Sequence, residues 1–116
     1  MAEGPPWRWR WAKVGPGRRP KPRFLWYAPR GVTFIPFDEL QRPLGGEPVY
    51  ILPDELEALR LVYLEGLKQE EAAKRMGVSR GTLWRSLDSG RKKVIRALVE
   101  HRPIVLVPPH EQGVEG

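Results

Sequence analysis

The sequence contains no cysteine among its 116 residues. A disulfide framework, a thiolate metal site and a thiol nucleophile are therefore excluded. Long apolar runs are missing as well, since no stretch approaches the roughly 18 residues that a membrane-spanning helix needs. The first twenty residues also lack the continuous apolar run of a signal peptide. These absences predict a cytoplasmic protein without a membrane partner.

Groupings of residues typical of catalysis are scarce too. His101 and His110 have no partners at the spacing of metal ligands, and adjacent Glu70 and Glu71 point in different directions on a short predicted helix. Gly45-Gly46 lacks the lysine and serine of a phosphate-binding glycine loop. We therefore expect neither an enzyme nor a metal or other cofactor.

Acidic residues are outnumbered, with 14 of them against 20 lysines and arginines and a formal net charge of +6. The excess lies in residues 1–23, which hold seven basic residues and one acidic residue, whereas the remainder of the chain is balanced. A basic protein of this kind favours an anionic partner, with nucleic acid first among the possibilities.

Composition divides the chain into four segments. Residues 1–23 mix proline, glycine, arginine and tryptophan and predict a flexible basic arm. Residues 24–52 predict short strands and a linker, with a strand at 33–35 and either a second strand or a docked linker at 49–52. Residues 53–101 predict the helical domain, and residues 102–116 a terminal strand and tail. The apolar run 104–107 could pair with 33–35 in its own chain or bridge two subunits.

Apolar spacing predicts three helices in the helical domain. The first begins at Pro53 and ends near Gly66, and the second covers 69–76. The third is one long helix over 80–100, with Ser79 as its cap. Gly90 is a weak point of that helix, since glycine costs about 1 kcal/mol relative to alanine.

The second and third predicted helices meet the needs of a helix-turn-helix. Such a motif has a small residue where the helices cross, a turn residue that tolerates positive φ, and an apolar residue that locks the helices together. Ala73, Gly77 and Leu83 satisfy these needs in order. Val78 and Leu87 complete the predicted motif core.

The outward side of the third helix then predicts a DNA-binding face. The residues assigned to base edges in the major groove are Ser79, Arg80, Gly81, Trp84, Arg85 and Asp88. The residues assigned to phosphates are Lys68, Arg91, Lys92, Lys93 and Arg96. Arg80 and Arg85 could each form bidentate bonds to guanine.

The sequence also resembles known families, through DELEALRL at 54–61, EGL at 65–67, QEEAA at 69–73 and MGVSRGT at 76–82. These motifs are similar to the fourth region of sigma factors and, more closely, to an uncharacterised prokaryotic family of short predicted DNA-binding proteins. The resemblance implies a mainly α fold, in which the helix-turn-helix is joined by a few short β-strands, and a role in transcriptional regulation. Leu52 and Lys68 depart from the family pattern, because Thr and Ser or Thr usually cap those helices. The cysteine often found in the basic head is absent as well.

Several alternatives remain open from sequence. The protein could instead be an interaction module docking on RNA polymerase, which would need an exposed apolar patch rather than a basic face, or it could bind RNA through the arm. Trp84 could touch DNA or pack against the arm or a second subunit. The alternating residues 7–11 could follow a phosphate backbone, enter a minor groove, sit at a membrane interface or form a solubilising tail. Double-stranded DNA is the expected partner, and a homodimer is possible.

Overall fold

The computed structural model describes residues 7–9, 23–25 and 30–109. Its elements in chain order are β1 (Trp7–Trp9), β2 (Arg23–Leu25), β3 (Val32–Phe34), β4 (Val49–Ile51), α1 (Pro53–Leu59), a π-helix η1 (Arg60–Leu64), α2 (Gln69–Met76), α3 (Arg80–Glu100) and β5 (Ile104–Leu106). The fold is mainly α with a few short strands, as predicted. The predicted bounds of α2 and α3 are confirmed.

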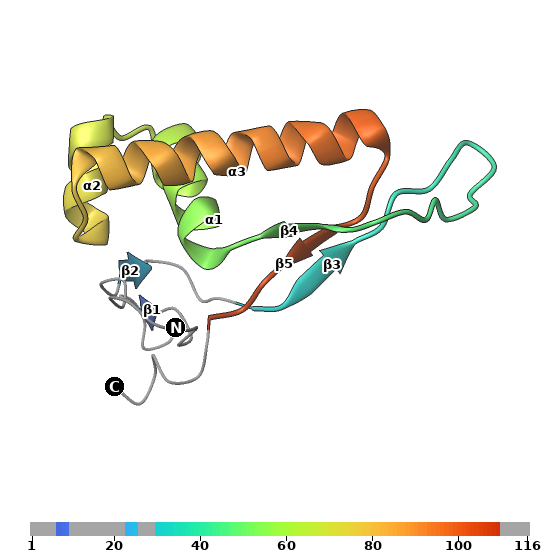
Figure 1. The fold of residues 1–116 in the computed structure, drawn as a ribbon, viewed down its shortest axis with the longest axis horizontal. Coiled ribbons are helices and arrows are strands. Elements are labelled where there is room, and N and C mark those ends of the chain that lie inside the picture. Colours follow the sequence, from blue (N-terminus) through green and yellow to red (C-terminus); the bar gives the residue numbers. More distant parts are fainter. Residues whose placement is uncertain (1–6, 10–22, 26–29, 110–116) are drawn as a thin grey trace, which may run out of the picture.

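The long helix α3 runs along one side of the molecule, with α1 and α2 against its N-terminal half and the sheet beneath its C-terminal half (Figure 1). Two apolar clusters hold these contacts. The helical cluster buries Ala58, Leu61, Ala72, Ala73, Met76, Leu83 and Leu87. The cluster between sheet and helix buries Val49, Ile51 and Ala97. α3 therefore joins the two parts of the fold, because its N-terminal half packs against α1 and α2 and its C-terminal half packs against the sheet.

The three-stranded sheet has the order β3–β5–β4, so β5 is its central strand. β5 runs antiparallel to β3, with Thr33 opposite Val105, and parallel to β4, with Tyr50 opposite Val105. The predicted pairing of the terminal strand with the 33–35 region is confirmed, with β3 shifted by one residue to Val32–Phe34. β5 thus closes a sheet within its own chain.

Part of the predicted arm forms a strand. β1 pairs antiparallel with β2, with Trp7 opposite Leu25. The Trp-Arg alternation in β1 has the period of two along which the side chains of a strand alternate. No strand was predicted here from sequence. Leu25 is fully buried, and β2 contacts both α1 and α2. Residues 1–6, 10–22 and 110–116, which include most of the predicted arm and His110, lie outside the described residues.

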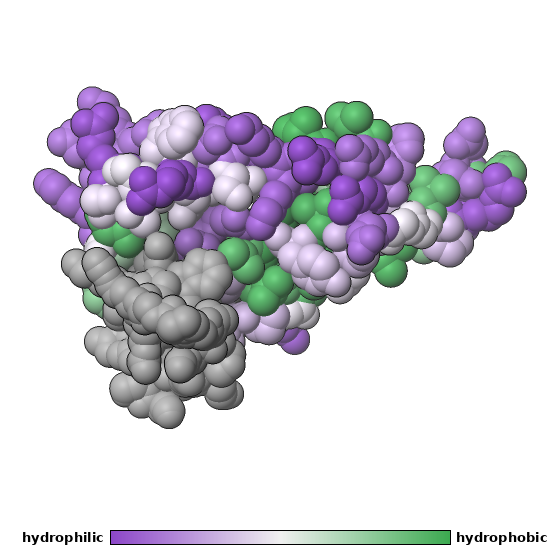
Figure 2. All heavy atoms as spheres, viewed as in Figure 1, coloured by the Kyte–Doolittle hydropathy of each residue, from purple (hydrophilic) through white to green (hydrophobic). Residues whose placement is uncertain are grey.

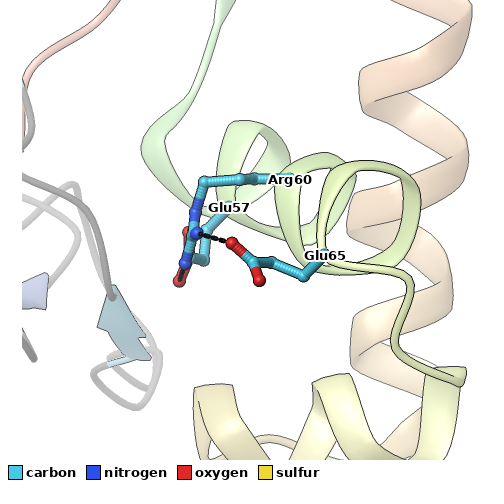
Figure 3. A network of polar contacts seen from close by, with 3 residues as sticks. All are labelled: Glu57, Arg60 and Glu65. Atoms are coloured by element: carbon cyan, nitrogen blue, oxygen red, sulfur yellow. Dashed lines mark hydrogen bonds and ion pairs between the residues drawn. The ribbon is translucent and has the colours of Figure 1, made fainter.

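The predicted helix 53–66 is divided into two kinds of turn. After α1 the chain widens into η1, where the amide of Glu65 donates to the carbonyl of Arg60 at 2.9 Å. The Arg60 guanidinium binds the buried Glu57 carboxylate at 2.8 Å and Glu65 at 3.0 Å (Figure 3). These charge-assisted bonds tie the end of α1 to the end of η1. Gly66 follows with a φ of 75°, which glycine adopts without strain.

The two helices that lack a Ser or Thr cap keep half of a capping box. The Leu52 amide donates to Glu55 Oε1 at 2.9 Å, and the Lys68 amide donates to Glu71 Oε1 at 3.0 Å. In each case the glutamate reaches back from the third helical position to satisfy the amide before the helix. The departures at Leu52 and Lys68 are thus offset in part.

Candidate nucleic-acid interface

The turn between α2 and α3 has the geometry that the sequence predicted. Gly77 ends α2 in the left-handed conformation, with φ 68° and ψ 34°. The Ser79 hydroxyl accepts the Thr82 amide at 3.1 Å and so caps α3. A Cβ on Gly77 would lie 3.2 Å from the Phe24 ring. Gly77 is therefore required both by its φ and by the close approach of β2.

Three of the five residues of the predicted motif core are buried. Leu83 and Leu87 have no exposed surface, and Ala73 is 4% exposed. Val78 is half-buried and packs against the same cluster. These contacts fix the rotation of α3 about its axis, and that rotation decides which α3 side chains face water.

The side chains at the start of α3 face water. Ser79, Arg80, Gly81 and Arg85 are exposed, and Trp84 retains 46% of its surface. Arg85 donates to the Thr82 hydroxyl at 3.2 Å. Within the described ranges, neither Arg80 nor Arg85 forms an ion pair with a carboxylate. Both guanidinium groups therefore stay available to an external anion.

Asp88 differs from the other residues assigned to base edges. Its carboxylate binds Lys92 at 3.1 Å and Arg91 at 3.4 Å. The hydrogen bond from Lys92, followed by the positive charges of Lys92 and Arg91, lowers the pKa of Asp88 below its ordinary value. Asp88 thus orients two cations of its own helix, a role that the sequence analysis did not assign to it.

The cations assigned to phosphates divide into three groups. Lys68 and Arg96 are exposed, and Lys92 keeps 72% of its side-chain surface. Arg91 donates to the Tyr63 hydroxyl at 2.8 Å, and this bond raises the pKa of Arg91. Lys93 instead turns to α1, where its ammonium lies 2.9 Å from Glu55. Arg91 and Lys93 are thus both half-buried, with 39% and 33% of their side-chain surface exposed, and Lys93 is the one that pairs with α1.

Lys93 belongs to a polar network that joins α1 to α3, which sequence reasoning missed. Glu55 accepts from the Ser89 hydroxyl at 2.6 Å as well as from Lys93. Asp54 accepts from the Ser86 hydroxyl at 3.1 Å. The spacing of Ser86, Ser89 and Lys93 along one flank of α3 was the available signal. Its acidic partners lie more than thirty residues away in sequence.

Polar and apolar surfaces separate along α3. In Figure 2, hydrophilic residues gather over α2 and the first half of α3, whereas green apolar residues stand over its C-terminal half. Ile95, Leu98 and Val99 are 56%, 61% and 69% exposed. An apolar patch of these three residues therefore lies beside the basic side of α3.

The described residues hold neither a metal site nor a membrane span. No three histidine, aspartate or glutamate side chains come together as metal ligands. In that same part of the chain, none of the helices has the length and apolar character needed to cross a membrane.

Comparison with known proteins identifies relatives in archaea and bacteria. The family model described as "Protein of unknown function DUF134" matches residues 13–110. A UPF0251 protein of Pyrococcus furiosus is 50% identical over 101 residues, covering 87% of this chain and 93% of the relative. A UPF0251 protein of Thermococcus kodakarensis is 51% identical, covering 68% of this chain and 75% of the relative. A UPF0251 protein of Vibrio parahaemolyticus is 46% identical, covering 75% of this chain and 79% of the relative. No solved structure matches the chain. The chain belongs to the uncharacterised DUF134 family, whose curated members are called UPF0251 proteins.

Proposed function

We propose that this protein binds duplex DNA through α2 and α3, used as a helix-turn-helix similar to that of sigma region four, and that it regulates transcription in the cytoplasm. The observation that carries the proposal is the pair Arg80 and Arg85. Both are exposed near the start of α3. At 3.6 residues per turn, Arg85 lies opposite the buried Leu83 and Leu87, and Arg80 lies on a flank of the helix. A guanidinium held in this way can donate two parallel bonds to guanine O6 and N7.

The dimensions of α3 support this arrangement. An α-helix with its side chains is about 10–12 Å across, so the stretch from Arg80 to Asp88 fits within the major groove, which is roughly 12 Å wide. Ser79, Gly81 and Trp84 lie on the same stretch and face water. We therefore assign base contacts to Ser79, Arg80, Gly81, Trp84 and Arg85.

Phosphate contacts follow from the cations that remain exposed. Lys68 and Arg96 are exposed, and Lys92 and Arg91 are oriented by Asp88. Such contacts position a protein on DNA without reading its sequence. We leave Asp88 out of the base contacts because its carboxylate is paired with Lys92 and Arg91, and Lys93 out of the phosphate contacts because its ammonium is turned to Glu55 on α1.

Gel-shift or anisotropy titrations over a range of salt concentrations test the proposal. The double variant R80A/R85A should lose about 30-fold or more in affinity for a preferred duplex, because each bidentate pair is worth about 1–3 kcal/mol. The matched control is R30A/R42A, which removes the same charge from exposed positions outside α2 and α3. If both double variants lose affinity equally, net charge rather than the proposed face drives binding. If R80A/R85A binds every duplex as well as the parent, the proposal is wrong.

Docking on a protein of the transcription machinery is the second candidate function. The exposed Ile95, Leu98 and Val99 favour it, because an interaction module needs such an apolar patch. Binding of RNA polymerase with unchanged affinity in R80A/R85A, in the absence of any DNA binding, would support this alternative.

A further inference from the structure

The two arginines at the start of α3 differ in how their guanidinium groups are held. Arg85 Nη2 donates to the Thr82 hydroxyl at 3.2 Å. Among the described residues, Arg80 has no hydrogen-bond or ion-pair partner for its side chain. A Cβ built on Gly81 would lie 3.7 Å from Arg85 Nη1. The Arg85 guanidinium therefore lies back over the first turn of α3, beside Thr82 and Gly81.

This position follows from the geometry of the helix. Residues three and four apart in sequence are neighbours on one face of an α-helix, and long side chains lean toward its N-terminus. Arg85 stands three residues after Thr82 and four after Gly81, and the glycine leaves that surface without a side chain. A recognition helix contacts base edges with its N-terminal residues, so the guanidinium lies where the proposed base contacts are made.

The Thr82 hydroxyl is itself held in place by the cap of α3. It accepts the Ser79 hydroxyl at 3.0 Å, and the Thr82 amide donates to Ser79 Oγ at 3.1 Å. A hydroxyl oxygen has two lone pairs, so it accepts Ser79 and Arg85 together. A chain of hydrogen bonds therefore runs from the helix cap to the guanidinium.

The guanidinium needs an acceptor in this position. The N-terminus of a helix carries a partial positive charge, which disfavours a cation close to it. Asp88 stands three residues further along α3, at the spacing where an ion pair with Arg85 can form. The Thr82 hydroxyl is the acceptor that keeps Arg85 at the first turn instead.

We propose that Thr82 is a positioning residue that determines how sharply Arg85 discriminates guanine from other bases. The inference rests on the proposed function. One N–H of the guanidinium is used by Thr82, and the four that remain are enough for guanine O6 and N7. Because Arg85 is held before DNA arrives, it loses less conformational freedom on binding than Arg80 does. Arg85 should therefore discriminate guanine more sharply than Arg80.

NMR relaxation of the arginine Nε–H groups tests the positioning without DNA. In the parent, Arg85 should be more ordered than Arg80. T82V keeps the shape of the side chain and the backbone amide bound by Ser79, and it should lower the order of Arg85 to that of Arg80. T82S keeps a hydroxyl and should preserve the order. T33V, at the other threonine of the chain, is the control and should change neither arginine. Equal order of both arginines in the parent, or unchanged order in T82V, overturns the proposal.

Base discrimination is measured with a duplex selected from a random pool. Each guanine in turn is replaced by 7-deazaguanine, which lacks the N7 acceptor. The guanine read by Arg85 is the one whose replacement weakens binding of the parent but not of R85A. At this guanine, T82V should lose about 2- to 10-fold of the discrimination, the net value of one hydrogen bond, and T82S should recover it. Undiminished discrimination in T82V contradicts the proposal.

The two measurements separate this inference from the proposed function. If R85A and the parent respond alike to every replacement, Arg85 does not read guanine and the proposed function fails at this residue. If one guanine depends on Arg85 but not on Thr82, the proposed function stands and the positioning fails. T82A removes the hydroxyl without the branched Cβ and provides a second variant if T82V unfolds. A loss of affinity in both variants that is equal for guanine and 7-deazaguanine indicates a structural role and counts against the proposal.

Discussion

Gly90 on α3 faces Glu55 on α1 so closely that a Cβ at position 90 would stand 3.2 Å from the Glu55 Cβ and 3.3 Å from its carbonyl oxygen. The Leu59 side chain would lie 3.1 Å away. The glycine that weakens α3 locally therefore permits the approach of α1. This approach brings Glu55 within hydrogen-bond distance of Ser89.

Alanine at position 90 should destabilise the fold. The crowding costs about 1–3 kcal/mol, and the gain in helix propensity offsets about 1 kcal/mol of it. We expect G90A to lower the free energy of unfolding by about 1 kcal/mol, measured by urea denaturation, and G90V to lower it further. L98A, at an exposed position on the same helix, should change stability little. An increase in the free energy of unfolding for G90A would show that α1 can shift to make room for the Cβ without loss of stability.

Replacing the two glycines near the turn by alanine should change the stability in opposite directions. Gly77 has a φ of 68° and a neighbouring Phe24 ring, so G77A should cost about 1–2 kcal/mol, the penalty of left-handed backbone for an L-residue. Gly81 lies within α3 and has no neighbour closer than 3.7 Å to a built Cβ. G81A should therefore raise stability by up to about 1 kcal/mol. Thermal denaturation of the pair measures both, and a loss of stability in G81A would contradict the described start of α3.

Neighbouring lysines should separate DNA affinity from stability. K92A removes an exposed cation and should weaken DNA binding about 2- to 5-fold and reduce its dependence on salt. K93A removes the partner of Glu55 on α1 and should lower stability while leaving DNA affinity nearly unchanged. Urea denaturation and anisotropy titration of both variants give the comparison. Equal losses of affinity would return Lys93 to the phosphate contacts.

We expect Asp88 to lower the affinity of α3 for DNA, because its negative charge offsets the nearby cations. D88N removes a charge that binds Lys92 and Arg91, so its affinity for random-sequence duplex should rise several-fold and its salt dependence should steepen. Unchanged affinity would mean that neither cation contacts DNA.

The pH dependence of Asp88 gives a separate measurement. Its pKa is lowered in the folded protein, chiefly by the hydrogen bond from Lys92. Its stabilising contribution is therefore complete above the ordinary aspartate pKa and is lost as the pH falls through the lowered value. NMR titration of the carboxyl group should show that K92M raises the Asp88 pKa, whereas K74M, on α2, leaves it unchanged.

Elements that depend on neighbours in sequence could be predicted, and those that depend on distant contacts could not. Gly77 and Ser79 act within a few residues of the helix ends they define, so both helix bounds followed from sequence. The contact of Lys93 with Glu55 could not be predicted, because the two residues lie 38 positions apart in sequence. A helical projection gives the direction of a side chain but not the element packed there.

The strand β1 and the π-helix were missed for related reasons. β1 pairs with a segment more than a dozen residues away, and the proline-rich composition around it favoured a flexible arm over a strand. The widened turn of η1 accompanies the binding of Arg60 to both Glu57 and Glu65. Residue types and spacing alone do not show that one guanidinium holds both carboxylates.

The central place of β5 has a consequence for the order of folding. β3 and β4 are not hydrogen-bonded neighbours, because β5 lies between them. Val32 pairs with Leu106, so during synthesis the sheet cannot form until Leu106 has left the ribosome. The α1–α3 contacts are closer in sequence and can close earlier. A chain stopped before residue 104 should consequently hold its helices without its sheet, and hydrogen exchange on such a fragment would show protected amides in α1, α2 and α3 but not in β3 or β4.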